Sequence, residues 1–387
     1  MWKKIAAPVL LGGALVAGAF AAHAEPARFS DQSGHWAADS IAQAVQKGYV
    51  DGYEDGTFRP DLKVTRAEFA KMVVTALKLP VGGNTGGADW YIPFANAAVN
   101  GGIHRWSDFN YGDWNTPITR QEMARMIVRA TNKELKKPDA NKADSELMYL
   151  AAKAGLIQGL QGGELGVNEA TTRAQSVTVI ERVLAVNGGG TLEADKYAVN
   201  RAELAWHKTN IFTVMPEFFS NLNPRYPWNI DNLFVETPDG DYRGELDALI
   251  AIDLDDPNDP NLYLLGALST LEWNNTVLQK GQLVSKLKNN YVLYFQGHEV
   301  YNNNKELYRS RGHVPYTLTG FIHNEGDFKN GEMSSIARVY QKNNEEIPAF
   351  LISKNAKVDG GFYVQLYAPV IAGNMPYYKT LLISLIE

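Results

Sequence analysis

The chain has 387 residues, a formal net charge of −6 at pH 7 and no cysteine. Hydrophobic residues make up 45% of the sequence and charged residues 21%, which is ordinary for a globular protein of two or three domains. The acidic balance and the lack of a recognisable basic motif argue against a nucleic-acid partner. A chain without cysteine draws no stability from disulfides.

Residues 1–24 have the pattern of a secretory signal peptide. Two lysines at positions 3 and 4 precede an apolar run over residues 5–21, and Ala-His-Ala at 22–24 is a small-x-small cleavage site. A retained membrane anchor is the alternative, but the apolar run is short and rich in alanine and glycine. We therefore expect a secreted protein that begins at Glu25 and has no membrane partner after cleavage.

A motif that begins Thr-Arg occurs three times, at residues 65–69, 119–123 and 172–176. The first two copies are 54 residues apart, and the second and third are 53 apart. In each copy the threonine is a natural helix N-cap, and a Glu or Gln three residues later closes a capping box. Self-similarity at this period predicts helix–loop–helix units that bury their apolar faces against one another.

The first copy contains a series of short segments in order. They are Phe-Ser-Asp at 29–31, His-Trp-Ala at 35–37, Gly-Tyr-Val-Asp-Gly at 48–52, Asp-Gly-Thr-Phe-Arg-Pro-Asp at 55–61 and Thr-Arg-Ala-Glu-Phe at 65–69. With these segments the copy resembles the S-layer homology (SLH) repeat. The resemblance covers residues 29–187, which we divide into repeats at 25–80, 81–135 and 136–187. It implies an all-α, pseudo-trimeric helical bundle that attaches a protein non-covalently to a secondary cell-wall polysaccharide, often pyruvylated, linked to peptidoglycan.

The arginine of each Thr-Arg motif is the first candidate for binding this glycan. At a capped helix start, a guanidinium offers charge-assisted, bidentate hydrogen bonds to a carboxylate such as that of a pyruvate ketal. An ion pair with a neighbouring acid is the alternative for each arginine. Two tryptophans are expected to stack on sugar rings, with packing into the bundle as the alternative. The expected glycan-binding residues are Arg66, Arg120, Arg173, Trp36, Trp90, Gly52, Gly56 and Lys47.

The second and third repeats depart from the SLH pattern. Repeat two has a different loop at residues 107–115, and repeat three has a shorter loop at 159–163. Repeat three also has Ala143 where the first repeat has Trp36. We therefore expect one or two competent binding grooves rather than three.

Residues 188–194 contain three consecutive glycines and are expected to form a flexible linker. The segment 195–387 resembles no family that we recognise. A helix is expected over 195–212, followed by an antiparallel sandwich or barrel, because the later sequence alternates aromatic and branched residues with turn residues. Its strands are expected at 244–254, 262–273, 291–301, 316–323, 336–341, 349–353, 361–369 and 377–386.

One loop of the C-terminal segment has a composition that suits a cation. Residues 253–261 are rich in side-chain oxygen, which calcium prefers, and no other cofactor is expected. A solvated turn stiffened by two prolines is the alternative. The expected calcium ligands are Asp253, Asp255, Asp256 and Asp259.

These patterns together favour a protein of the cell wall or S-layer of a Gram-positive bacterium. Its repeats would anchor it, and the C-terminal domain would have a structural or adhesive role, with other S-layer subunits as partners. An anchored enzyme or solute-binding domain is the alternative. The lack of a catalytic constellation in the sequence favours the non-catalytic reading.

Overall fold

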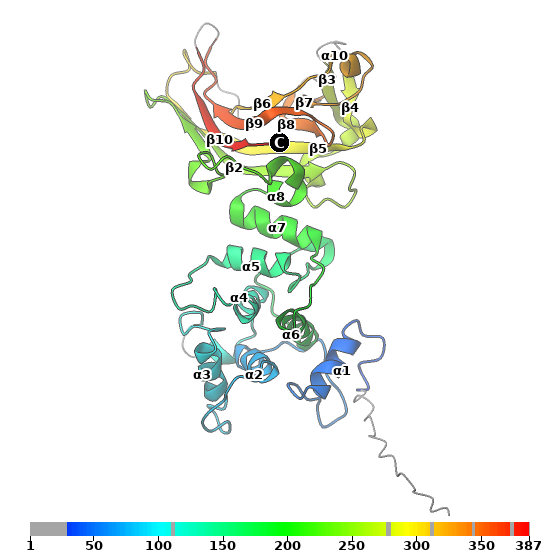
Figure 1. The fold of residues 1–387 in the computed structure, drawn as a ribbon, viewed down its shortest axis with the longest axis vertical. Helices are drawn as coiled ribbons and strands as arrows, with labels where there is room; N and C mark the ends of the chain where they lie inside the picture. Colours follow the sequence, from blue (N-terminus) through cyan, green and yellow to red (C-terminus); the bar gives the residue numbers. More distant parts are fainter. Residues whose placement is uncertain are drawn as a thin grey trace, which may run out of the picture.

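A computed structural model of the chain places a helical module below a domain of β-strands (Figure 1). No helix in the described part is long and apolar enough to cross a membrane. The expected signal peptide, residues 1–24, lies outside the described residues. The structure describes residues 29–109, 113–275, 280–309, 313–342, 345–371 and 375–386.

The helical module consists of three pairs of helices. In each pair a loop separates a first helix from a second helix, and short 3-10 helices η1 (Asp113–Asn115) and η2 (Gln161–Gly163) lie in two of the loops. The first helices are α1 (Ala38–Gln46), α3 (Ile92–Asn100) and α5 (Asp144–Lys153), and the second helices are α2 (Arg66–Ala76), α4 (Arg120–Thr131) and α6 (Arg173–Asn187).

The second helices begin where the sequence predicted. Thr65, Thr119 and Thr172 each accept a hydrogen bond from the backbone N–H three residues later, and the side chain at that position bonds back to the threonine N–H. All three capping boxes are therefore confirmed. Each box satisfies two backbone donors that would otherwise lack a partner at the helix start.

The three pairs interlock in a ring. α3 packs against α2, α5 packs against α4, and α1 closes the ring by packing against α6. Each first helix therefore lies on the second helix of another repeat. Isolated β-bridges connect the segments that precede the second helices, pairing Lys63 with Thr172, Thr65 with Pro117 and Thr119 with Ala170.

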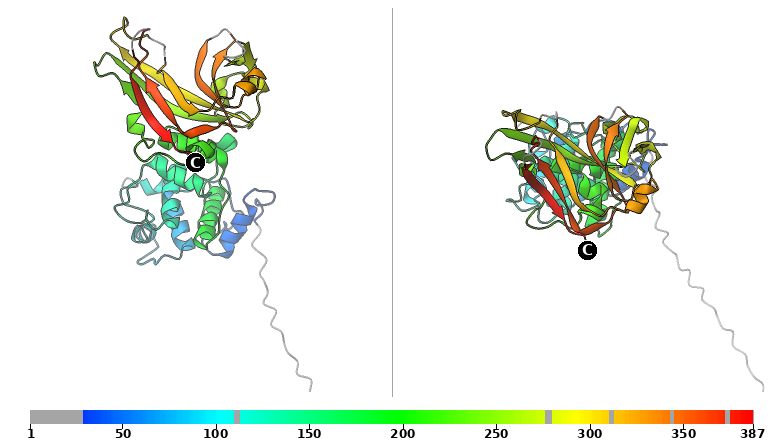
Figure 2. Two further views of the ribbon diagram at one scale, coloured as in Figure 1. Left: turned by 45° about the horizontal axis from the view of Figure 1, so that its top comes forward. Right: turned by 90° about the horizontal axis from the view of Figure 1, so that it is seen from above.

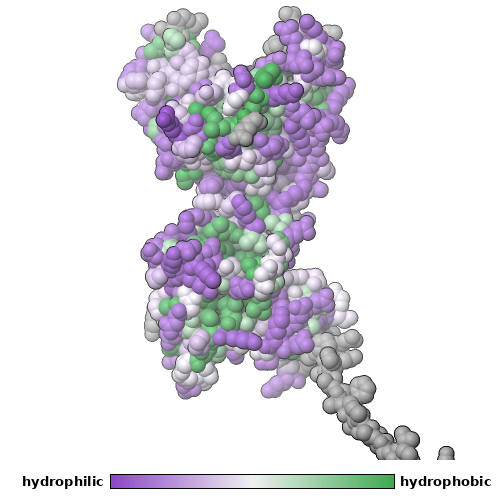
Figure 3. Space-filling model, viewed as in Figure 1, coloured by the Kyte–Doolittle hydropathy of each residue, from purple (hydrophilic) through white to green (hydrophobic). Residues whose placement is uncertain are grey.

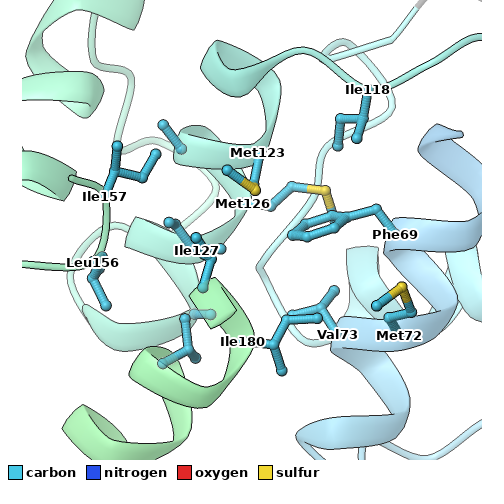
Figure 4. Close-up of a cluster of buried hydrophobic side chains, with 14 of the residues drawn as sticks. Phe69, Met72, Val73, Ile118, Met123, Met126, Ile127, Leu156, Ile157 and Ile180 are labelled. Carbon is cyan, nitrogen blue, oxygen red and sulfur yellow. The ribbon is translucent and has the colours of Figure 1, made fainter. Parts of the chain in front are cut away.

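The second helices meet in the core of the helical module. Val73, Ile127 and Ile180 occupy the same position in the three repeats, and all three are fully buried. Figure 4 shows these side chains beside Phe69 and Met126, facing one another from α2, α4 and α6. Hydrophobic residues are visible on the surface along the middle of the module, between more polar margins (Figure 3). Equivalent positions thus build one shared core.

The C-terminal domain contains two antiparallel sheets. The larger has the order β1-β2-β5-β8-β7-β3-β4 and the smaller β10-β9-β6. Figure 2 shows both sheets at the end of the molecule away from α1 and α3. The strands are β1 (Phe234–Glu236), β2 (Tyr242–Asp253), β3 (Leu271–Asn275), β4 (Lys280–Leu283), β5 (Asn290–Asn302), β6 (Tyr316–Phe321), β7 (Ile336–Gln341), β8 (Glu346–Ser353), β9 (Val358–Tyr367) and β10 (Tyr378–Ser384).

The strand predictions are confirmed with one main exception. Residues 262–273 were expected to form one strand, but η4 (Leu262–Leu265) and η5 (Leu268–Thr270) fill most of that range before β3 begins. Gly266 between the two turns has a φ of +63°, which breaks an extended path. The strands β1 and β4 were not predicted. The other short elements are η3 (Ile230–Asn232), η6 (Val284–Lys286) and α10 (Glu325–Lys329).

Two apolar cores cover the two faces of the larger sheet. One lies between the sheets and includes Phe295, which stacks on Tyr316 with ring centroids 4.2 Å apart. The other covers the opposite face and includes Trp273. Both faces of the larger sheet are therefore buried over part of their area.

The helix α7 (Lys196–His207) connects the two domains. It ends five residues earlier than expected, because Lys208 adopts a left-handed conformation, and the chain continues as α8 (Ile211–Val214) and α9 (Pro216–Phe219). Ala198 and Ala202 are buried in the core of the helical module, while Leu204 packs against the core of the β domain. A helix shared by both cores therefore follows the glycine-rich segment 188–194, and this helix couples the domains.

Candidate functional site

Two of the three motif arginines connect one repeat to the loop of another. The Arg120 guanidinium donates from Nε to the carbonyl oxygen of Leu165 at 2.8 Å and from Nη2 to that of Gln158 at 2.7 Å. Arg173 repeats this geometry on the first loop, donating to the carbonyls of Phe58 and Asp51 at 2.9 and 2.8 Å. Both arginines therefore hold a loop against the start of a second helix.

Arg66 has a different set of partners. It forms an ion pair with Glu122, the capping acid of the second repeat, and its Nε donates to Oε2 of that residue at 3.2 Å. Its Nη1 also donates to the carbonyl of Asp113 at 3.2 Å. The ion-pair alternative is thus what the structure shows for Arg66. This contact was hidden in the sequence because the acid is 56 residues away.

A cavity of about 380 Å³, which we call groove A, lies between the first loop and α2. Gly52 of the first repeat, Trp90 of the second and Arg173 of the third line it together. Lys71 of α2 also lines it, 5.8 Å from the centre of the Trp90 ring, and has no ion pair with a described residue. Two acids line it: Glu68 is engaged in the capping box, and Asp51 is exposed. Groove A therefore combines an aromatic face with an available cation.

A second cavity of about 350 Å³, groove B, is built in the same way from other repeats. Its loop residue is Gly159 of repeat three, its tryptophan is Trp36 of repeat one, and its motif arginine is Arg120 of repeat two. Arg182 of α6 supplies a further cation, and no acid lines this cavity. Groove B is thus the more positive of the two.

Arg182 is the least satisfied cation in either groove. Its side chain is half-buried and forms no hydrogen bond or ion pair within the described part of the chain. Burial lowers the pKa of Arg182, and burial also lowers the pKa of Arg120 beside it. Glu169 partly offsets the effect of burial on the pKa of Arg120, whereas no carboxylate offsets it for Arg182. An anionic ligand in groove B would supply that partner.

The third equivalent position is closed by ion pairs. Arg125 corresponds to Lys71 of groove A, and it pairs with Asp144 at 2.8 Å. Arg129 corresponds to Arg182 of groove B and pairs with Asp108. Trp106 stands where the other loops have glycine, and Ala143 stands where the other grooves have tryptophan. The cations here already have carboxylate partners, so grooves A and B are the open grooves of this type among the described residues.

Of the other residues expected to bind the glycan, two lie outside both grooves and one lines groove A. Lys47 forms an ion pair with Glu181 and does not line either groove. Gly56 has a φ of +77° in an exposed turn outside both grooves. A Cβ at Gly52 would lie 2.0 Å from the Phe29 ring, so this glycine is required for packing of the loop as well as for its position in groove A.

Sequence reasoning missed Lys71 and Arg182. The signal that would have found them is the repeat register, in which Lys71 corresponds to Arg125 and Thr178, and Arg182 to Thr75 and Arg129. Comparing these positions shows that each repeat has at least one cation or hydroxyl facing its loop. The sequence alone does not show which cations are paired.

The acidic loop 253–261 is held by lysines instead of forming a metal cluster. Lys354 contacts Asp253 at 2.6 Å and Asp255 at 3.0 Å, and Lys196 contacts Asp256 at 2.7 Å. Asp259 accepts hydrogen bonds from two backbone N–H groups of the loop. No group of three or more His, Cys, Asp or Glu residues in the described part is arranged to hold a metal. These contacts are compatible with the turn alternative, and calcium binding by the loop stays a prediction.

The comparisons with known proteins identify the repeats. A family model for the S-layer homology domain matches residues 28–70 and 138–175, within the first and third repeats. The resemblance is thus confirmed for these two segments, which match the S-layer homology domain. The unmatched second repeat is the one with the divergent loop.

Curated relatives match this chain over less than half of its length. An S-layer protein of Bacillus thuringiensis subsp. finitimus is 31% identical over 183 residues, which cover 44% of this chain and 22% of the relative. The S-layer protein sap of Bacillus anthracis is 33% identical over 137 residues, covering 33% and 17%. Exoglucanase XynX of Acetivibrio thermocellus is 28% identical over 175 residues, covering 40% and 16%. The matched part is about a fifth of each of these relatives.

Proposed function

We propose that the helical module anchors this protein to the cell surface by binding an acidic, pyruvylated secondary cell-wall polysaccharide in grooves A and B. The observation that carries the proposal is the shared design of the two grooves. Each combines a tryptophan, a glycine loop and a cation without a carboxylate partner, and each draws them from different repeats. A ketal carboxylate would pair with the cation while its sugar ring stacks on the tryptophan.

In this proposal the motif arginines act mainly as positioning residues. Arg120 and Arg173 each donate two hydrogen bonds to backbone carbonyl groups of a loop. Arg120 thereby sets the position of Gly159 in groove B, and Arg173 sets that of Gly52 in groove A. Lys71 and Arg182 are the residues that would contact the carboxylate. This division differs from the sequence-based assignment, which gave the ligand role to the motif arginines.

The C-terminal domain is proposed to be a structural or adhesion domain held on the cell surface. Its support is the packing of α7 against the cores of both domains and the S-layer proteins among the matched relatives. An anchored enzyme is the second candidate, because the exoglucanase from Acetivibrio thermocellus is also among these relatives. Hydrolysis of wall or plant glycans by the full chain would favour the enzyme.

A pull-down on purified cell walls tests the anchoring proposal. The double variant Lys71→Ala/Arg182→Ala should lose most of its binding to untreated walls, and removal of ketal pyruvate from the walls should reduce wild-type binding to the same level. The control Lys133→Ala/Arg225→Ala removes the same charge from exposed residues outside both grooves and should bind like wild type. Equal binding of both double variants would overturn the proposal.

A further inference from the structure

A larger cavity adjoins groove B. It has a volume of about 960 Å³ and runs between α1, the end of α2 and α6. We call it the trough. It shares four lining residues with groove B, namely Trp36, Gln158, Thr178 and Arg182. Because the two cavities meet along these residues, a ligand can pass from one to the other without leaving the protein surface.

The chemistry of the trough suits neutral sugars. Ser40 of α1 and Thr75 of α2 present hydroxyl groups that bond to no other residue in the described part of the chain. Gln43 adds an exposed amide, and Lys78 adds an ammonium group without an ion pair among the described residues. Two acids also line the trough: Glu181 is paired with Lys47, and the exposed Asp39 of α1 can accept hydrogen bonds from sugar hydroxyl groups. Neutral donors and acceptors beside an aromatic ring are what the hydroxyl groups of a glycan require.

Trp36 stands at the junction of the two cavities. Its side chain is 65% exposed, although it is one of the largest apolar side chains of the module. Its ring lies beside His35, with centroids 5.4 Å apart. An exposed ring that borders both cavities can stack on the sugar that lies between them. Trp90 of groove A, by contrast, is half-buried against Tyr91 and Phe94.

Thr75 lines both the trough and groove A, but the position beside groove A that corresponds to the α1 side of the trough has different residues. Ser40 and Gln43 of α1 correspond to Phe94 and Ala97 of α3. Phe94 packs against the hydrophobic core of the module, so it fills the space that is open beside α1. The two grooves therefore share a tryptophan, a glycine loop and a cation, but differ in the position of that cation and in the residues beyond it.

We propose that the trough is an extended subsite for the glycan, which rests on the proposed function of groove B. Groove B would hold an acidic sugar at Arg182, and the trough would hold the neutral sugars next to it in the polysaccharide. The Trp36 ring would stack on the sugar at the junction of the two cavities. Groove A would hold one acidic sugar alone. The two grooves then differ in the length of polysaccharide that they recognise.

The test compares two probes on the full chain with groove A disabled by Lys71→Ala. One probe is the methyl glycoside of a single pyruvate-ketal sugar, and the other is a size-selected wall oligosaccharide of three or more sugars with the same acidic sugar. The oligosaccharide should bind about tenfold more tightly, which is the gain expected from one net additional hydrogen bond. Titration calorimetry measures both affinities.

Adding Ser40→Phe/Gln43→Ala copies the second repeat into the trough without touching the lining of groove B. It should remove the tenfold advantage and leave the affinity for the single sugar unchanged. Ala185→Trp fills the same cavity from the exposed face of α6 and serves as a second blocking variant if the first does not fold. Equal affinity for both probes, or an advantage that survives a blocked trough, would overturn the inference while groove B stands. Failure of both probes to bind would overturn the proposed function as well.

Discussion

Arg120→Ala is expected to destabilise the helical module strongly. The side chain is 4% exposed, and its two hydrogen bonds to the Leu165 and Gln158 carbonyls are 2.8 and 2.7 Å long. A hydrogen bond from a charged donor contributes about 1.5–3 kcal/mol, and the two carbonyls would lose their donor in a place where water has little access. The burial that lowers the pKa of Arg120 offsets part of this gain. We therefore expect a loss of about 3 kcal/mol.

Urea unfolding followed by helical circular dichroism, without glycan, measures this loss. With a slope of about 2 kcal/mol per molar urea, the midpoint should fall by about 1.5 M. Arg120→Lys should recover only part of it, because one ammonium cannot span two carbonyls in the manner of a planar fork. Arg201→Ala, which breaks a 2.9 Å surface pair with Glu164, should cost less than about 1 kcal/mol. Similar urea midpoints for Arg120→Ala and Arg201→Ala would refute the role of Arg120 in holding the loop against the helix.

Three further results are expected. Burial raises the pKa of Glu203 to about 7 from 4.5, so its stabilising contribution is present below pH 4.5 and lost as the pH rises through 7. The unfolding free energy of wild type relative to Glu203→Gln should therefore fall by about 3 kcal/mol over that window, and parallel pH profiles would contradict this. Arg66→Ala should lower the unfolding midpoint but leave wall binding unchanged; the reverse pattern would restore its ligand role. Millimolar calcium should leave the melting temperature unchanged, whereas a rise would restore the calcium site.

Much of the helical module could be predicted because its signals are local. The capping boxes at Thr65, Thr119 and Thr172 depend on residues three positions apart, and the repeat period shows that the units pack on one another. The partners of the motif arginines depend instead on how the three repeats pack into a ring. Whether a guanidinium meets a carbonyl or an acid is set by which loop lies against its helix, and repeat two presents Glu122 to Arg66.

The C-terminal domain shows the same limit. Most of its strands have a clear alternation of apolar residues, so their existence was predicted. The acidic loop was read from composition alone, whereas its lysine partners lie 60 and 101 residues away along the chain. The glycines of residues 188–194 predicted a flexible linker, and that stays a prediction. The helix that follows packs Ala198 and Leu204 on two different cores, which depends on the tertiary fold and could not be predicted from local sequence.

The central claim is that two of the three inter-repeat grooves bind an acidic sugar through Lys71 and Arg182. Titration calorimetry with the methyl glycoside of a pyruvate-ketal sugar tests it most directly, because it counts sites as well as measuring affinity. Wild type should show two binding sites, Lys71→Ala one, Arg182→Ala one and the double variant none. Three sites in wild type, or undiminished binding by a folded double variant, would contradict it.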